Sequence, residues 1–257
     1  MTSFLGPLRI ANLLFILSFV APFAAVAAQR KTPLSENSLK HLTISSVEVV
    51  DITNSYENYS AYFEYNMSPN DWISSPIEGT IDKVDLVVDK VINIGQKIWT
   101  VIEKGKPVVN YTSSSANALP ANATRWDQLE NWNQPKSKII GVIYKNAYGM
   151  EVIRFKYRLL LLYGGSANGV GKYIGYAAVE PLEMTVAYMY TLNVKVAVDA
   201  VYNMGTKTNP IAGMILNINW TVETVLKKST MTHSYVLDGT GNIAVPPSSQ
   251  ISFNSSL

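Results

Sequence analysis

The sequence predicts a mainly β, antiparallel, sandwich-like fold with one amphipathic helix at about residues 80–104. Two observations predict the sheets: residues 185–202 alternate in hydrophobicity with a period of two, and several shorter segments do the same. A third observation predicts the helix, because residues 80–104 carry apolar side chains at helical spacing instead. If that helix were central to the core, the fold class would be α+β.

Residues 185–202 form the longest alternating segment of the chain. At ~3.3 Å per residue a single strand of this length would span ~60 Å, well beyond a usual strand. The segment therefore either bends and contributes to both sheets of a sandwich, or belongs to an elongated sheet. Every second residue from Ala187 to Val201 belongs to the less apolar face of this segment, and this face is most polar in the middle, around Asn193 and Lys195. We expect a solvent-facing middle, with Lys195 exposed, and covered ends.

The remaining strands are shorter, and turn-forming residues separate them. We expect a phase shift near Ser45 and Ser46, and an end to one strand before Pro181. The glycine-rich residues 164–171 are interpreted as a hairpin loop, and residues 238–242 as a tight turn. The expected strands cover residues 41–52, 59–67, 138–146, 150–163, 172–179, 211–226, 232–237 and 243–245.

The helix predicted at residues 80–104 has a competing interpretation. Thr80 can cap its N-terminus, and Gly105 and Pro107 can end it. Its apolar residues are mostly Val and Ile, however, which favour strands. The alternative is therefore strand–turn–strand, with the turn at residues 93–95. The apolar positions at helical spacing are Ile81, Val84, Val88, Val91, Ile98 and Ile102.

The first 28 residues have the pattern of a secretory signal peptide. Arg9 precedes an apolar run that ends in small residues. A retained membrane anchor is the alternative. The rest of the chain, residues 29–257, is expected to form a single mainly β domain, with residues 29–40 and 246–257 flexible. We therefore expect an exported protein, periplasmic or extracellular.

Composition excludes some functions and leaves others open. The chain has no cysteine, so neither thiol catalysis nor a cysteine-ligated metal is available, and we favour a bacterial source. Without Arg9, 20 basic and 19 acidic side chains remain, with no basic run that would predict nucleic-acid binding. Whether its Asn-x-Ser/Thr sequons carry glycans stays open.

Catalytic residues are not identifiable. The two histidines, His41 and His233, are far apart, and no nucleophile-turn motif is present. We therefore predict no catalytic residue, no metal ligand and no cofactor, and favour a protein that is not an enzyme. A hydrolase with paired carboxylates that the fold brings together remains an alternative.

The aromatic residues provide the best functional indication. Trp72, Trp126 and Trp132 lie in segments expected to be loops, where binding residues concentrate. With many Asn and Ser residues nearby, they are candidates for stacking on sugar rings. The competing interpretation is that these tryptophans only anchor their loops to the core.

These observations predict an exported β-sandwich binding or interaction domain. Its candidate ligands are a carbohydrate, a cell-envelope component or another envelope protein. The first alternative is an outer-membrane-associated or pore-forming β protein, because long alternating strands with tyrosines are also typical of that class. The second alternative is the hydrolase. The sequence does not determine the oligomeric state.

Overall fold

The computed structural model describes residues 35–55, 85–107 and 115–246. Twelve strands, one α-helix and two 3₁₀ turns are assigned within these ranges. In chain order they are α1 (Glu36–Leu42), β1 (Ile44–Asp51), η1 (Thr53–Ser55), β2 (Val87–Ile92), β3 (Ile98–Glu103), β4 (Lys106–Pro107), β5 (Ala116–Ala121), η2 (Trp126–Gln128), β6 (Lys136–Asn146), β7 (Glu151–Ala167), β8 (Val170–Val186), β9 (Thr191–Asn203), β10 (Ala212–Glu223), β11 (Lys228–Asp238) and β12 (Ile243–Ala244).

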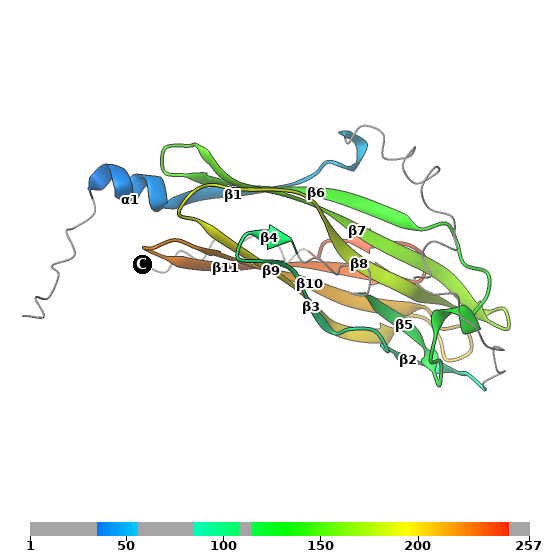
Figure 1. Ribbon diagram of the computed structural model, residues 1–257. Helices are drawn as coiled ribbons and strands as arrows, with labels where there is room; N and C mark the ends of the chain where they lie inside the picture. Colours follow the sequence, from blue (N-terminus) through cyan, green and yellow to red (C-terminus); the bar gives the residue numbers. More distant parts are fainter. Residues whose placement is uncertain (1–34, 56–84, 108–114, 247–257) are drawn as a thin grey trace, which may run out of the picture. The chain divides into compact units, whose positions relative to one another are not determined.

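The strands form two six-stranded sheets, and neighbouring strands within each sheet are antiparallel. The first sheet has the order β1-β6-β7-β8-β5-β2, and the second has the order β12-β11-β10-β9-β3-β4. One hydrophobic core takes side chains from both sheets, which lie over one another as two layers (Figure 1). The predicted mainly β, antiparallel, sandwich-like fold class is therefore confirmed.

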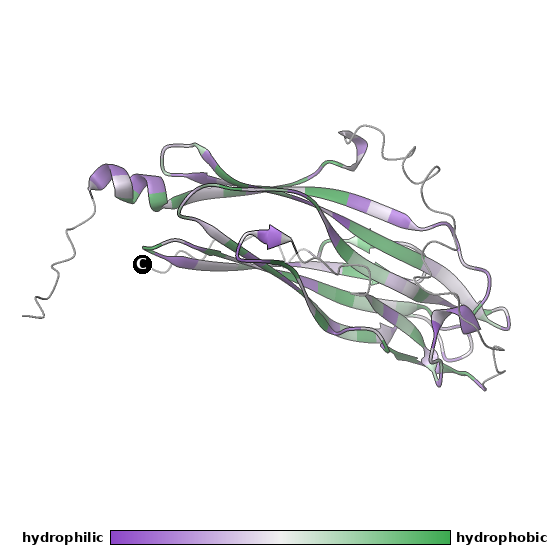
Figure 2. Ribbon diagram, viewed as in Figure 1, coloured by the Kyte–Doolittle hydropathy of each residue, from purple (hydrophilic) through white to green (hydrophobic). Residues whose placement is uncertain are grey.

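The sheets pack as two layers because buried and less buried side chains alternate along the strands, so that one face of each sheet is covered by the other. In β10 each inward residue from Met214 to Val222 is buried, and each residue between them is only partly buried. Figure 2 shows the same change between hydrophobic and hydrophilic residues along several strands. Across the core, the hydroxyl groups of Tyr157 on β7 and Tyr235 on β11 lie 2.8 Å apart in a buried hydrogen bond. This bond satisfies two polar groups that burial would otherwise leave unpaired.

The segment at residues 185–202 does contribute to both sheets. Its first two residues end β8 in the first sheet, and the residues from Thr191 onward form β9 in the second. A turn with Tyr190 N–H donating to Ala187 C=O joins them. Lys195 is exposed on β9, while Val194 and Val196 on either side of it are fully buried. The predicted solvent-facing middle is confirmed, but the prediction of covered ends is wrong at the first end, where Met189 is 41 % exposed in the turn between β8 and β9.

The helix predicted at residues 80–104 is wrong. Within the described part of this segment, the structure contains β2 and β3, with a bend at Gly95 between them. The competing strand–turn–strand interpretation is therefore correct. The one α-helix in the described part of the chain is α1, in residues expected to be a flexible lead-in and the start of a strand. No helix in the described residues is long and apolar enough to cross a membrane.

Smaller details of the strand pattern both agree and disagree with expectation. The pairing of β1 with β6 shifts register between Ile44 and Ser46, as predicted. Pro181 lies inside β8 instead of ending a strand, beside a register shift that accommodates its missing N–H. The hairpin at residues 164–171 is tighter than expected, because Asn168 and Gly169, both with positive φ, form its two-residue turn. The strand expected at residues 59–67 lies outside the described residues.

His233 on β11 gives the core a predictable pH dependence. Its ring is 5 % exposed, its centroid lies 4.7 Å from that of Tyr235, and burial lowers its pKa. The unfolded chain therefore binds this proton more tightly than the folded one. We expect the free energy of unfolding to fall as pH drops below about 6.5, by up to about 1.4 kcal/mol per pH unit. Urea unfolding at a series of pH values measures this slope.

Two variants test whether His233 causes this change in the free energy of unfolding with pH. His233→Phe is expected to flatten the slope between about pH 6.5 and the folded pKa, because it removes the group that is protonated on unfolding. His41→Gln is the matched control and is expected to retain the slope of the wild-type protein. Equal slopes for the wild-type protein and His233→Phe would show that other groups cause the pH dependence.

Candidate functional site: a polar depression on the second sheet

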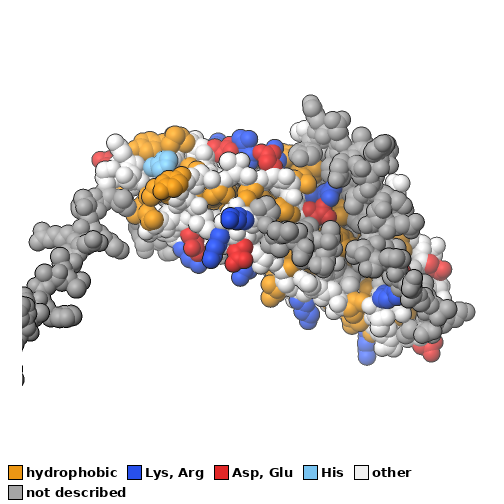
Figure 3. Space-filling view, in the orientation of Figure 1, with side chains coloured by type: hydrophobic (Ala, Val, Ile, Leu, Met, Phe, Trp, Pro, Cys, Tyr) orange, Lys and Arg blue, Asp and Glu red, His pale blue; other side chains and the backbone are white. Residues whose placement is uncertain are grey.

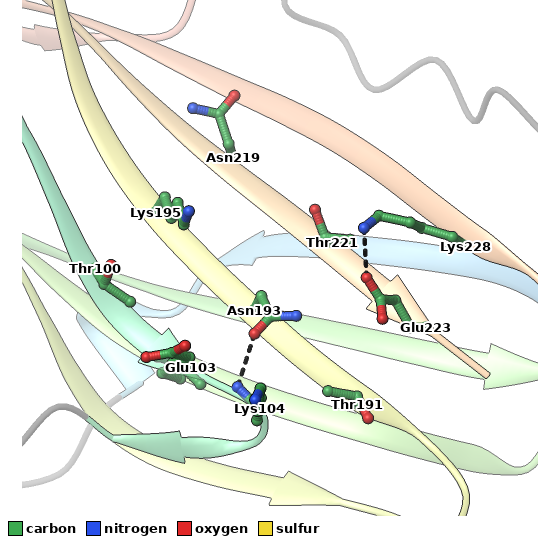
Figure 4. Close-up of a pocket in the computed structure, with 11 residues that line it drawn as sticks. Thr100, Glu103, Lys104, Thr191, Asn193, Lys195, Asn219, Thr221, Glu223 and Lys228 are labelled. Carbon is green, nitrogen blue, oxygen red and sulfur yellow. Dashed lines mark hydrogen bonds and ion pairs between the residues drawn. The ribbon is translucent and has the colours of Figure 1, made fainter. Parts of the chain in front are cut away.

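A depression of about 520 Å³ lies on the outer face of the second sheet (Figure 4). It extends over β3, the turn after β3, β9, β10 and the start of β11. Its lining residues are polar or charged with one exception, Ile102. They are Thr100, Ile102, Glu103, Lys104, Thr191, Asn193, Lys195, Asn219, Thr221, Glu223 and Lys228.

Strand register places these polar side chains in rows across the sheet. Lys195 on β9 is paired with Thr100 on β3 on one side and with Asn219 on β10 on the other. Asn219 is in turn paired with Thr232 on β11. Directly opposed residues of an antiparallel pair point to the same face, so this row faces solvent, as Lys195 does. A second row pairs Asn193 with Thr221 in the same way.

Hydrogen bonds within the depression orient its two asparagine amides. The Oδ1 atom of Asn219 accepts a hydrogen bond of 2.7 Å from the Thr232 hydroxyl. The Oδ1 atom of Asn193 accepts one of 2.7 Å from the backbone N–H of Lys104. Each amide thus uses its oxygen within the protein. Its NH₂ group, which can donate two hydrogen bonds, has no acceptor among the residues that the structure describes and is left for an external one.

The charged groups add to this excess of donors. Lys228 is held by Glu223, with its Nζ atom 2.6 Å from a carboxylate oxygen. In the described part of the chain, the ammonium groups of Lys104 and Lys195 have no ion-pair or hydrogen-bond partner. Glu103 supplies the one carboxylate of the depression without an ion pair there. The site therefore suits a ligand rich in hydrogen-bond acceptors, with some hydroxyl groups to donate to Glu103.

Of the tryptophans chosen from the sequence, Trp126 and Trp132 do not line the depression. Trp72 is outside the described residues. Trp126 and Trp132 are brought together, with ring centroids 6.0 Å apart in an edge-to-face arrangement. Both are partly buried against the core. The ring of Trp132 covers Gly165 and Gly175, where an added Cβ would lie 2.4 and 2.8 Å from it. Trp132 thus anchors the segment between β5 and β6.

Trp126 lines a smaller hollow, of about 300 Å³, that shares no residue with the polar depression. Arg125 and Asp127 beside it form an ion pair with each other. The side-chain oxygen of Gln128 accepts hydrogen bonds from the backbone N–H groups of Thr124 and Arg125, at 2.8 and 3.1 Å. The hollow therefore combines one half-buried ring with polar groups that are already paired within the loop.

Neither histidine lines the depression. His41 lies at the end of α1, where its ring faces Tyr190, and His233 is in the core. Among the described residues, no three His, Asp or Glu side chains gather in a way that could hold a metal ion.

Sequence reasoning recognised part of the polar depression without identifying it as a site. The alternation of β9 already placed Asn193 and Lys195 on the solvent face. The sequence does not predict that Thr100, Glu103 and Lys104 line the depression, because the apolar spacing of their segment predicts a helix at residues 80–104. One pattern in the sequence could have identified the site. Two strands that follow each other in the chain, β9 and β10, each carry polar residues at alternate positions, and a turn joins them.

Comparisons with known proteins provide no relative from which a role could be transferred. No protein-family model, curated protein or solved structure matches the chain.

Proposed function

We propose that this protein is an exported binding domain that holds an acidic carbohydrate of the cell envelope in the polar depression. The observation that carries the proposal is the orientation of the donors: two asparagine NH₂ groups and two ammonium groups, all without a partner among the described residues, face one depression. Uronic acids and similar sugars offer carboxylate and hydroxyl oxygens to such donors. The export part of the proposal rests on the signal-peptide pattern of residues 1–28.

The form of the site also favours a binding function. Its side chains on β9, β10 and β11 lie on strands whose backbone pairing is continuous across the site, so they are held in place before a ligand arrives. An open, shallow depression suits an extended chain of sugar units better than an enclosed small molecule.

Binding to soluble polysaccharides tests this proposal. We expect the wild-type protein to bind polygalacturonate and to bind uncharged dextran more weakly. Lys195→Ala is expected to weaken polygalacturonate binding by at least about tenfold, because a hydrogen bond to a charged group is lost. Lys207→Ala, an exposed lysine in the turn after β9, is the control and is expected to bind normally. Isothermal titration calorimetry measures these four affinities.

Other outcomes of this titration would contradict the proposal. Equal affinities for Lys195→Ala and Lys207→Ala would place the ligand elsewhere, and no binding to either polysaccharide would remove the acidic-carbohydrate class. Loss of binding in Trp126→Ala alone would move the site to the smaller hollow around that ring. Release of new reducing ends from the polysaccharide would show a hydrolase instead of a binding domain.

A further inference from the structure

Three turns lie together at the end of the domain that also carries α1 (Figure 1). They join β6 to β7, β8 to β9, and β10 to β11. The backbone C=O of His41 on α1 accepts hydrogen bonds from Tyr190 and Asn146, which connects the first two turns. The third turn is adjacent because Thr191 pairs with Glu223.

These turns expose large apolar side chains, which we call the apolar tip. It holds half of the twelve exposed large hydrophobic residues in the described part of the chain. Tyr188 is 89 % exposed and Val225 is 68 % exposed. Figure 3 shows hydrophobic side chains gathered at this end of the domain. The members of the apolar tip are Tyr148, Met150, Tyr188, Met189, Val225 and Leu226.

The turn between β8 and β9 presents its apolar side chains at a cost to stability. Met189 has a φ of +71°, a left-handed conformation that glycine or asparagine adopts with less strain. Tyr190 is 7 % exposed and anchors the turn through its hydroxyl group, so the turn is held firmly while Tyr188 points outward. Backbone strain at an exposed apolar residue does not stabilise the fold, so it indicates that this turn has a function.

The turn between β10 and β11 is also held firmly. The Thr224 hydroxyl oxygen accepts hydrogen bonds from the backbone N–H groups of Leu226 and Lys227, both at 3.2 Å. The backbone N–H of Thr224 donates to the C=O of Lys227 at 2.8 Å. Val225 and Leu226 are therefore presented on a fixed turn, which lowers the entropy that docking them would cost.

Basic groups lie beside the apolar tip. Glu36 and Glu223 are paired with Lys40 and Lys228, so those charges are balanced within the domain. In the described residues, the ammonium groups of Lys104, Lys106 and Lys227 have no such partner. An ideal Cβ placed on Gly105, the residue between the first two, would lie 3.8 Å from a methyl group of Val186 at the end of β8. Unpaired positive charge thus borders the exposed apolar side chains.

We propose that the apolar tip docks on the surface of an anionic lipid bilayer. Tyr188, Met189, Val225 and Leu226 would enter the boundary between headgroups and acyl chains, where aromatic and aliphatic side chains are stable. Lys104, Lys106 and Lys227 would face the lipid phosphates, and this attraction falls as salt screens the charges. None of the four residues that would insert lines the polar depression. The bilayer-docking proposal and the carbohydrate-binding proposal can therefore fail independently of each other.

Vesicle sedimentation tests the docking proposal on the full chain as its producing cell processes it. We expect binding to vesicles of phosphatidylcholine and phosphatidylglycerol in equal parts, and weaker binding to phosphatidylcholine alone or at high salt. The double variant Tyr188→Ser/Met189→Ser is expected to lower the partition coefficient by at least about tenfold, because two large apolar side chains no longer insert. Both positions are exposed, so thermal unfolding should show a folded protein.

A matched double variant provides the control. Ile98→Ser/Met204→Ser removes two exposed apolar side chains outside the apolar tip and is expected to bind vesicles normally. Equal losses in the two double variants would overturn the proposal, as would absence of binding to the anionic vesicles. Sedimentation equilibrium separates the remaining case: a wild-type dimer that Tyr188→Ser/Met189→Ser dissociates, without vesicle binding, would make the tip a contact between two copies of this chain.

Discussion

Trp220→Ala is expected to lower the free energy of unfolding by about 3–5 kcal/mol, the range found for buried tryptophans. Trp220 is 1 % exposed on the inner face of β10. Its ring centroid lies 6.3 Å from that of Tyr157 on β7 and 5.8 Å from that of His233 on β11. The substitution therefore leaves a cavity where the two sheets meet. Urea unfolding followed by fluorescence or circular dichroism measures the loss.

The control for this experiment is the same substitution at a less buried tryptophan. Trp126 is only partly buried against the core, so Trp126→Ala is expected to cost less than half as much. Each variant is compared with the wild-type protein in the same buffer at neutral pH. Equal costs for Trp220→Ala and Trp126→Ala would contradict the placement of Trp220 between the two sheets.

Gly165→Ala is expected to destabilise the protein by about 1–3 kcal/mol, through crowding of the Trp132 ring. A Cβ on Gly165 would lie 2.4 Å from two carbon atoms of that ring. The ring would have to leave its place over β7 and β8, and the segment between β5 and β6 would lose its anchor. Thermal unfolding measures the effect on stability, and tryptophan fluorescence reports the displaced ring.

Gly141→Ala is the matched control on β6. An added Cβ there would lie 3.6 Å from the nearest atom of Ile52, which is ordinary van der Waals contact. We expect a change within about 0.5 kcal/mol for this variant, as for most substitutions that meet no clash. If Gly165→Ala were as stable as Gly141→Ala, Trp132 would be mobile, and its proposed role as an anchor would be wrong.

The strands with regular alternation could be predicted from the sequence because each carries its own evidence of a buried face. Residues 211–226 predict β10, and residues 138–163 predict the hairpin of β6 and β7. Along one face of β7 the residues change from charged to apolar, which predicts that this face becomes more buried along the strand. Lys156 is partly buried, whereas Leu160 on the same parity is 1 % exposed.

The segment at residues 80–104 shows why periodicity can mislead. Val and Ile recur there at intervals that fit a helix, yet the strands are short and their partners are distant in the sequence. Trp99 pairs with Val196, and Ile92 pairs with Leu119. Such long-range pairing leaves no local pattern, and a register shift in each of these two strands blurs the alternation further. The β-branched composition was the better guide.

The candidate site was even less predictable than the fold. Alternation shows that Asn193 and Asn219 face solvent, but not that Thr232 and the Lys104 backbone occupy their oxygens. The excess of donors is therefore a property of tertiary structure. Tryptophans in predicted loops are obvious candidates for binding, yet the Trp132 ring lies over Gly165 and Gly175 of the sheet.

A titration followed by nuclear magnetic resonance tests most directly whether the polar depression binds acidic carbohydrate. The ¹⁵N-labelled protein is titrated with oligogalacturonate, and the side-chain amides of Asn193 and Asn219 are compared with the indole groups of Trp126 and Trp132. We expect saturable shifts of the two asparagine amides, lost in Lys195→Ala, with the indole signals unchanged. Shifts confined to the indole signals, or no saturable shift, would contradict the assignment of this depression as the binding site.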